Sequence, residues 1–338
     1  MNINRRQFLT TSGITALATI LSTQKVKAIP PQTIIKPLRL RVGDTVGLVA
    51  PASIVDKSDI ETARQTLMKL GLKVKLGKYV LERYGYLAGR DSERAFDINA
   101  MFTDKSIQGI IGMRGGWGCN RILPLLDYNN IRSNPKIIIG YSDITSLLLA
   151  IGARSRIITF HGPVATSTWN DFTLSYLKPI LFDGTAVTMQ NPTTEAAQIQ
   201  LITPGKAKGK LIGGNLSVLC AMIGSAYLPS WNRQILFVED IGEDVYRVDR
   251  MLTQLNNAGI LNRISGFIFG QCTNCKPGEA PTFALIQVLK DHIQPLGIPA
   301  WYGSMIGHIK DKFTLPIGAE VEIDASLGTI KMLEGAVL

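Results

Sequence analysis

The stretch KIIIGYSDITSLLLAI, residues 136–151, places a short polar corner between two apolar runs. The β-branched run that ends at Gly140 is typical of a buried strand, and the Leu- and Ala-rich run after the corner is typical of a helix. Ser142 therefore stands where a strand turns sharply into a helix. A serine in this place either caps the following helix, which is the commoner role, or lifts its hydroxyl into a cleft as a nucleophile.

The residues before this corner alternate between strand-like and helix-like patterns. Strands are predicted over 44–53, 73–80 and 108–113, and helices over 59–71, 93–102 and 120–126. Such alternation predicts a parallel sheet flanked by helices. Sites in these sheets form at the carboxyl ends of the strands, where we expect both Ser142 and the turn RGGWG, residues 114–118.

The strand and helix rhythm is lost over residues 169–208, which are polar and carry NPTTEAAQ and TPGKAKGK. This segment is predicted to link an N-terminal domain, residues 29–168, to a C-terminal domain, residues 209–338. The C-terminal part has a strong strand at 234–239 and ends in an alternating, hairpin-like segment. The predicted fold class is α/β, with a parallel-sheet domain followed by a smaller mixed domain that is rich in β-structure at its end.

The first 28 residues, MNINRRQFLTTSGITALATILSTQKVKA, resemble a bacterial twin-arginine export signal. The pattern stands here as Arg5-Arg6-Gln7-Phe8-Leu9. An apolar segment too short to span a bilayer follows, and VKA is a small-residue cleavage pattern. An uncleaved amphipathic anchor is the alternative. We expect removal of residues 1–28, no stable membrane insertion afterwards, and a periplasmic protein.

Charge limits the possible partners. Residues 1–28 hold four cations and no acids, so their removal lowers the formal net charge from +10 to +6. The sequence shows no Lys/Arg block with interleaved aromatic residues, so we expect no nucleic-acid binding.

Four cysteines stand at positions 119, 220, 272 and 275. Cys272-Thr-Asn-Cys275 has a spacing that suits redox or zinc chemistry. A zinc site needs a second pair of ligands, and no other pair has the spacing. All four cysteines are therefore predicted to be structural.

Three histidines could act as a base. His308 lies in GSMIGHIKDKFTLPIG, next to a glycine and outside any regular period, so it is predicted to be a loop histidine and is the better candidate. His161, in ITFHGP, either lines a cleft or is structural. His292 stands at a helix end, where a histidine needs no function.

An acid that orients the base is expected at a rigid position. Glu239 closes the apolar run ILFV and points towards whatever the end of that strand faces. Glu243 and Asp244, a few residues later, suit the N-terminal cap of the next helix. Capping therefore accounts for the later acids and leaves Glu239 as the candidate.

Six segments together resemble one family. In sequence order they are GMRGGWGCNRILPLLD, IGYSDITSLL, TFHGP, GKLIGGNLSVL, FVEDIGEDVYRVDRML and IGHIKDKFTLPIG. They are similar to the LD-carboxypeptidase family of serine peptidases and its microcin-immunity relatives, from about Gly43 to the C-terminus. The resemblance implies that Ser142 is the nucleophile, His308 the general base and Glu239 the residue that orients it. It also implies a Rossmann-like N-terminal domain, a C-terminal domain built around a β-barrel, a site between them, and often a homodimer.

The residue types suit that chemistry. A serine hydroxyl needs an imidazole to accept its proton, and the imidazole needs a carboxylate to fix its tautomer. Ile144 stands where the pattern G-x-S-x-G has its second glycine, so the corner is not that of an α/β-hydrolase. The backbone N–H groups of Asp143 and Gly116 are predicted to form an oxyanion hole.

The family resemblance implies hydrolysis of the L-D bond of peptidoglycan-derived tetrapeptides, with release of terminal D-alanine and without metal or cofactor. Arg114, Gly115 and Trp117 are candidates for binding the substrate, although Arg114 could equally be a surface arginine and the glycines a tight turn. One alternative is a microcin-immunity-like hydrolase of peptide-nucleotide amides, which an export signal disfavours. The other is a periplasmic peptide-binding protein without chemistry.

Overall fold

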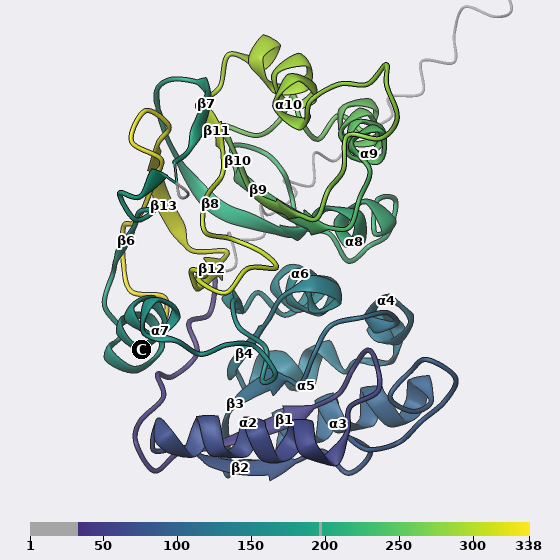
Figure 1. Ribbon diagram of the computed structural model, residues 1–338. Coiled ribbons are helices and arrows are strands. Elements are labelled where there is room, and N and C mark those ends of the chain that lie inside the picture. The colour runs from purple at the N-terminus through teal and green to yellow at the C-terminus, as the bar shows by residue number, and fades with distance from the viewer. Residues whose placement is uncertain (1–32, 196–197) are drawn as a thin grey trace, which may run out of the picture. The chain divides into compact units, whose positions relative to one another are not determined.

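Two β-sheets organise the part of the chain that the computed structural model describes, residues 33–195 and 198–338. Residues 34–338 form one compact unit, and in Figure 1 the sheet from the first half of the chain lies below the other. The proposed export signal, residues 1–28, lies outside the described residues. Within the described residues, no helix is long and apolar enough to cross a membrane.

The lower sheet has six strands in the order β12-β5-β4-β3-β1-β2. Its first five strands in sequence are parallel, and β12 is antiparallel to its neighbour β5. The strands β3 and β4 are almost entirely buried, as expected where helices cover both faces of a sheet. This confirms the predicted parallel sheet. The strands are β1 (Thr45–Val49), β2 (Lys73–Leu76), β3 (Ile107–Gly112), β4 (Ile137–Gly140), β5 (Thr159–His161) and β12 (Leu315–Ile317).

The helices of this half are α2 (Lys57–Lys69), α3 (Asp91–Thr103), α4 (Cys119–Ile122), α5 (Tyr128–Ser133) and α6 (Thr145–Ser155). Four of them, α2, α3, α4 and α6, follow the predicted order, and α5 was not predicted. The predicted helix over 120–126 is shorter than expected, because after Ile122 the chain tightens into a 3₁₀ turn over Leu123–Leu125 that contains Pro124.

The strand β2 ends earlier than predicted. It stops at Leu76, whereas the sequence pattern extended it to residue 80. Asp97 of α3 causes this, because its Oδ2 accepts a hydrogen bond from the backbone N of Tyr79 at 2.9 Å. A Cβ on Gly77 would lie 2.4 Å from the same oxygen. The carboxylate thus takes the backbone donor that a longer strand would have kept for the sheet.

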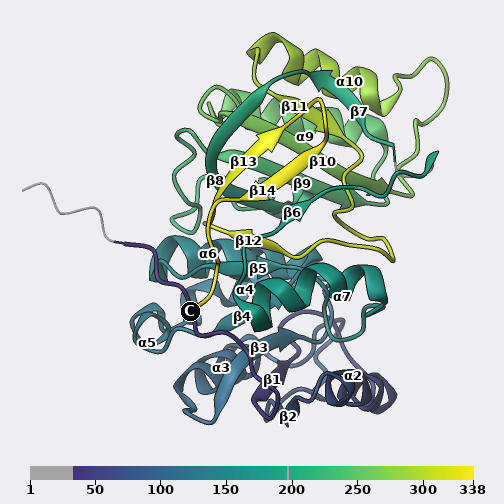
Figure 2. The ribbon, with the colours of Figure 1, turned by 90° about the vertical axis from the view of Figure 1, so that its left-hand side faces the viewer.

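The upper sheet has eight strands in the order β6-β14-β13-β8-β9-β10-β11-β7. The long strand β8 joins its two halves, pairing antiparallel with β13 through its first half and parallel with β9 through its second. The sheet curls around β8, as Figure 2 shows, which confirms the predicted mixed, barrel-like second part. The strands are β6 (Thr188–Met189), β7 (Gln200–Thr203), β8 (Lys206–Asn215), β9 (Ile235–Ile241), β10 (Gly266–Thr273), β11 (Ala300–Tyr302), β13 (Glu320–Asp324) and β14 (Thr329–Met332).

Helices α8 (Leu216–Ala221), α9 (Val245–Asn257) and α10 (Leu285–Ile293) accompany the parallel strands of this sheet (Figure 1). The segment predicted as a linker, residues 169–208, contains helix α7 (Asp171–Lys178), the strands β6 and β7, and the start of β8. The chain also returns to the lower sheet at β12. The predicted domain boundaries stay a prediction.

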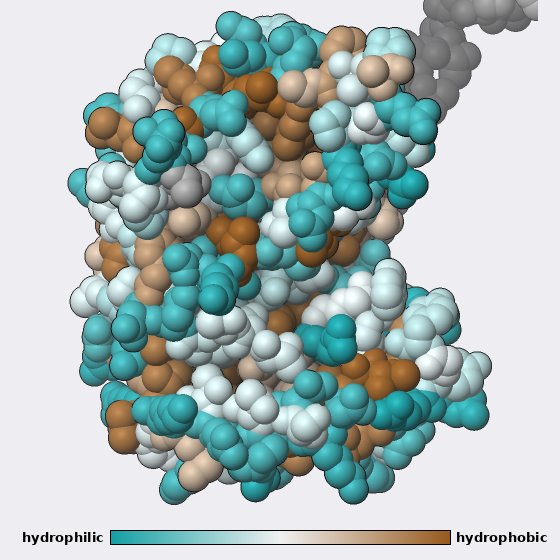
Figure 3. All heavy atoms as spheres, viewed as in Figure 1, coloured by the Kyte–Doolittle hydropathy of each residue, from teal (hydrophilic) through white to brown (hydrophobic). Residues whose placement is uncertain are grey.

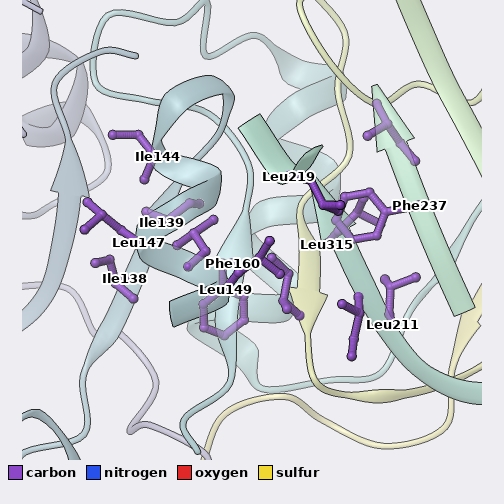
Figure 4. Packing of buried hydrophobic residues seen from close by; sticks show 14 of the residues in the cluster. Ile138, Ile139, Ile144, Leu147, Leu149, Phe160, Leu211, Leu219, Phe237 and Leu315 are labelled. Carbon is purple, nitrogen blue, oxygen red and sulfur yellow. The ribbon is translucent and has the colours of Figure 1, made fainter. Parts of the chain in front are cut away.

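Helix α6 lies between the two sheets and joins their cores. Its residues 145–151 are all buried. The apolar cluster continues without a break from Ile139 and Phe160 of the lower sheet to Leu211 and Phe237 of the upper sheet (Figure 4). A helix that is buried on every side explains why the segment TSLLLAI shows little polar periodicity.

The cysteines are buried or paired. Cys272 and Cys275 form a disulfide, so the zinc alternative for this pair is wrong. Cys119 and Cys220 are free and buried, and burial raises the pKa of both thiols, that of Cys220 to about 12. All of this agrees with structural cysteines.

Candidate active site

The corner after β4 holds Ser142 in an uncommon backbone conformation. Ser142 has a φ of 61°, in the left-handed region that residues other than glycine rarely adopt. Gly140 permits the sharp turn, because a Cβ there would lie 2.8 Å from the side chain of Ile144. The N-cap of α6 is Ile144, without a side-chain cap, so the capping alternative for Ser142 is wrong. Such strain concentrates at functional sites, and the geometry is that of a nucleophile elbow.

Two hydrogen bonds hold this corner from different sides. Asp143 Oδ2 accepts from the backbone N of Cys119 at 2.8 Å, at the start of α4. Thr145 Oγ1 accepts from the backbone N of Asn215 at 2.9 Å, at the end of β8. Both bonds are buried. The corner is therefore tied to the lower sheet's glycine-rich turn and to the upper sheet at once.

The glycine-rich turn, residues 114–118, lies against Ser142. A Cβ on Gly115 would lie 2.7 Å from Ser142 Oγ and 3.3 Å from the backbone N of Asp143. Gly116 has a φ of 126°, and a Cβ there would lie 1.7 Å from Ser53 Oγ. A side chain at either position would displace its neighbours. The segments that carry the predicted oxyanion donors thus meet at the corner, while the donors' role stays a prediction.

Glu239 and His308 come together from distant parts of the chain. Their Oε2 and Nδ1 atoms are 2.8 Å apart, and Glu239, on β9, is fully buried. His308 follows Gly307, where a Cβ would lie 2.7 Å from Glu239 Oε2. The carbonyl of His308 accepts a hydrogen bond from Thr273 Oγ1 at 3.1 Å. A carboxylate on Nδ1 fixes the tautomer that leaves Nε2 free to accept a proton.

Ser142 and His308 line one cavity of about 820 Å³. On the face shown in Figure 3, the surface is hollowed between the region of α8 and the region of α4. Glu239 does not line this cavity, but it contacts His308, which does. The other predicted site residues line the cavity as well: Arg114, Gly115, Gly116, Trp117 and Asp143.

Arg114 and Trp117 contribute an exposed cation and an exposed aromatic ring to this cavity. Trp117 is 65% exposed and packs edge to face on Tyr86, with ring centroids 6.1 Å apart. Arg114 donates from Nη1 to the carbonyl of Ile54 at 3.4 Å, and it forms no ion pair with any described residue. Its guanidinium is therefore available to a ligand that carries a carboxylate.

A polar network that the sequence analysis missed forms the upper wall of the cavity. Asp240 Oδ1 accepts from Asn215 Nδ2 at 3.0 Å, and Asp240 Oδ2 accepts from the backbone N of Ser217 at 2.8 Å. Asn215 Oδ1 caps α8 by accepting from the backbone N of Val218 at 3.1 Å. Burial raises the pKa of Asp240 to about 6, and the charge of Glu239 acts in the same direction. In the sequence, the Asn-Leu-Ser pattern after the paired glycines could have indicated that Asn215 caps a helix here.

His161 lies behind the Glu239–His308 pair. It is 2% exposed, its ring is 5.2 Å from that of Phe237, and its Nδ1 has no hydrogen-bond partner among the described residues. Burial lowers the pKa of His161 to about 4, against the opposing charge of Glu239. His161 is absent from the cavity lining, so the cleft-lining alternative is wrong.

The remaining histidine, His292, pairs with Asp249 between α10 and α9, their Nε2 and Oδ1 atoms 2.6 Å apart. Over residues 33–195 and 198–338, no group of three or more His, Cys, Asp or Glu side chains is arranged to hold a metal ion.

We expect His161 to destabilise the fold in acid. The ordinary pKa of histidine is about 6.5, so between about pH 6.5 and pH 4 His161 binds a proton in the unfolded chain but not in the folded protein. The free energy of unfolding therefore falls as the pH falls through this range. His161→Gln removes this contribution. Between about pH 6.5 and pH 4, we therefore expect the free energy of unfolding to decrease in both proteins, but by about 2–3 kcal/mol less in the variant than in wild type. Denaturant titrations at several pH values measure it. Equal pH dependence in the two proteins would contradict the assignment.

Asp240 affects the pH dependence of stability in the direction opposite to His161, over an overlapping pH range. Because its folded pKa of about 6 lies above the ordinary aspartate pKa of 3.8, its contribution to stability falls as the pH rises through that range. This contribution is present in wild type and variant alike, so the difference between the two proteins isolates His161.

Comparison with known proteins identifies relatives over both halves of the chain. The LD-carboxypeptidase N-terminal domain model matches residues 46–162, and the LD-carboxypeptidase C-terminal domain model matches residues 208–323. A Bacillus subtilis protein named probable murein peptide carboxypeptidase is 40% identical over 299 residues, which cover 86% of this chain and 92% of the relative.

Solved structures share the fold. The microcin C7 self-immunity protein MccF in complex with aspartyl sulfamoyl adenosine has a TM-score of 0.83 at 27% identity, covering 90% of this chain and 100% of that chain. Muramoyltetrapeptide carboxypeptidase from Oxalobacter formigenes has a TM-score of 0.74 at 30% identity, covering 85% and 97%. With both domain models matched and a relative at 40% identity along most of its length, the chain belongs to the LD-carboxypeptidase family.

Proposed function

We propose that the protein is a serine LD-carboxypeptidase that hydrolyses the L-D peptide bond of murein tetrapeptides and releases the terminal D-alanine. The observation that carries the proposal is the buried Glu239–His308 hydrogen bond beside a cavity that Ser142 enters from a strained corner. The membership in the LD-carboxypeptidase family and the similarity to murein peptide carboxypeptidases support the substrate class.

Catalysis proceeds in two steps on these residues. Ser142 Oγ attacks the scissile carbonyl while His308 Nε2 takes the hydroxyl proton, and Glu239 stabilises the imidazolium. The backbone N–H groups of Gly116 and Asp143 stabilise the oxyanion. The C–N bond then breaks, His308 returns its proton to the leaving amine of D-alanine, and the remaining tripeptide is an ester on Ser142. Water, deprotonated by His308, then attacks that ester, the bond between the carbonyl carbon and Ser142 Oγ breaks, and Ser142 Oγ takes the proton back from His308.

The cavity suits a short peptide with a free carboxyl end. Its volume of about 820 Å³ is in the range of pockets that enclose ligands of this size. The guanidinium of Arg114, which forms no ion pair within the described part of the chain, supplies a partner for the terminal carboxylate, and Gly115 and Trp117 shape the same wall. A carboxypeptidase needs such a partner, because a free carboxylate distinguishes the last bond of a peptide from the internal ones.

We expect mature wild-type protein to release D-alanine from a diaminopimelate tetrapeptide in the presence of EDTA. Ser142→Ala removes the nucleophile, so we expect turnover to fall by about 10³-fold or more while the fold is retained. Mass spectrometry of the peptide measures the loss of one alanine, and thermal unfolding checks the fold. Unchanged turnover in the alanine variant would sink this proposal.

One alternative function has an observation in its favour. The similarity to the MccF structure in complex with aspartyl sulfamoyl adenosine supports a hydrolase of peptide-nucleotide amides that uses the same three residues. The two functions differ in substrate, so the tetrapeptide and an aminoacyl sulfamoyl adenosine assayed side by side separate them. A peptide-binding protein without chemistry would bind the tetrapeptide and give no product.

We expect Gly115→Ala to impair chemistry more than folding. The added Cβ would lie 2.7 Å from Ser142 Oγ, so the hydroxyl must move from its place by the turn. We expect kcat/KM for the tetrapeptide to fall by about 10²-fold or more, the size of a lost oxyanion contact, with little change in Tm. Gly152→Ala is the matched control, because its Cβ would have no atom nearer than 3.7 Å. A Gly115 variant as active as the control would place the turn away from the reaction.

We also propose that the protein is exported. The support is the sequence of residues 1–28 alone, with its Arg5-Arg6-Gln7-Phe8-Leu9 pattern. In a Gram-negative host, we expect the wild type in the periplasmic fraction with these residues removed. Replacing Arg5 and Arg6 by lysine is expected to leave an unprocessed protein inside the cell. Equal export of both forms would refute the twin-arginine assignment. The predicted homodimer stays a prediction.

A further inference from the structure

Lys312 is a buried cation beside the site, with no role in the reaction described so far. It lies in the loop between His308 and β12 and is 4% exposed. Its Nζ lies 4.2 Å from the centre of the Tyr141 ring, and it forms no ion pair with any described residue. Tyr141 immediately precedes Ser142, and its ring centroid is 4.8 Å from that of His308. Lys312 and the base therefore both lie close to the same aromatic ring.

Glu239 is the acid whose charge acts on this cation. It is fully buried, and its Oε1 has no hydrogen-bond partner among the described residues. Burial lowers the pKa of Lys312 to about 8, while the negative charge of Glu239 acts in the opposite direction. Lys312 is therefore protonated below about pH 8, across the range in which a serine peptidase needs its histidine to lose a proton.

The other groups around the Glu239–His308 pair do not supply a positive charge. His161, from β5, is neutral because burial lowers its pKa to about 4. The Tyr141 hydroxyl, from the end of β4, is neutral because burial raises its pKa. Asp240, next along β9, adds a negative charge above its pKa of about 6. Within this described cluster, Lys312 alone offsets the two carboxylates.

A buried lysine beside the Tyr141 ring carries a large desolvation penalty. An apolar side chain of similar length packs behind an aromatic ring without the desolvation penalty of an ammonium group. A positive charge near a carboxylate–imidazole pair makes it harder for the pair to take up a proton.

We propose that Lys312 is a positioning residue that keeps the Glu239–His308 pair free of a bound proton at neutral and mildly acidic pH, so that His308 can accept the proton of Ser142. This inference rests on the proposed hydrolase function. Lys312 acts through the electrostatic field at the pair, near the Tyr141 ring that both it and His308 approach, and it is not among the residues that line the cavity.

The test is the pH profile of kcat/KM for release of D-alanine, from roughly pH 5 to 9, in four proteins. Lys312→Met keeps the length of the side chain and removes its charge. Lys312→Arg keeps the charge. Lys136→Met is the matched control, because Lys136 is also buried and has a pKa lowered to about 8, but donates to the carbonyl of Met101 away from the site.

We expect the acid limb of the Lys312→Met profile to move up by about one pH unit, so that kcat/KM on that limb falls about tenfold. We expect the plateau at higher pH to be retained, and Lys312→Arg and Lys136→Met to keep the wild-type limb. Thermal unfolding at each pH checks that the Met variant is folded, and we expect a lower Tm than in wild type because the two buried carboxylates lose the cation that offsets them.

Three results would overturn the inference. One is an acid limb in Lys312→Met within about 0.3 pH unit of wild type. Another is a uniform loss at every pH that Lys312→Arg shares, which indicates a packing role only. The third is an equal shift in Lys136→Met. Failure of the proposed function itself is separate, because it would appear as full activity in Ser142→Ala or as no hydrolysis by wild type.

Discussion

The left-handed backbone of Ser142 is the constraint on which the rest of the site depends. Conformations of this kind cost on the order of 1–3 kcal/mol and persist only where the surroundings hold them. The conformation of Ser142 is maintained by the Asp143–Cys119 and Thr145–Asn215 hydrogen bonds and by the close approach of Gly115. One of these contacts belongs to the upper sheet. The serine can therefore be presented only when both sheets are assembled around α6.

This dependence explains why the two halves of the chain share one core. Helix α6 begins at the strained corner and is buried on all sides over residues 145–151, and its first residue is hydrogen-bonded to the end of β8. A Cβ on Gly214 would lie 2.4 Å from the Thr145 side chain, so the close approach of helix and strand requires a glycine there. The same strand leads into the Asn215–Asp240 network that forms the opposite wall of the cavity. Packing and site are thus built from the same contacts.

Sequence patterns predicted the parallel sheet because buried parallel strands are uniformly apolar, and the run before Gly140 is of that kind. They did not predict where β2 ends, since Asp97 acts from a different helix. Nor could they show that β12 returns to the lower sheet. The residues Ser142, Glu239 and His308 were identified through resemblance to a family, and the structure brings Glu239 and His308 into contact across 69 positions of sequence. Spacing alone had left the role of Ser142 open between cap and nucleophile.

The buried charges behind the site were missed for a physical reason. In the sequence, Lys312 is one of two lysines in HIKDK, and nothing marks it as the one that turns inward. Its location depends on the loop after His308 and on Tyr141 from another strand. Asp240 likewise looks like one of several acids until its partners from β8 and α8 are known. Charge placement in a core is a property of the assembled fold.

The central claim is that Ser142 and His308 act as one chemical unit. A double-mutant cycle on kcat/KM for D-alanine release, with Ser142→Ala, His308→Ala and the double variant, tests this most directly. The account predicts that each single substitution removes nearly all of the activity and that the second adds almost nothing, because a base without its nucleophile has no proton to take. Losses that multiply in the double variant would show that the two residues act independently and would contradict the account.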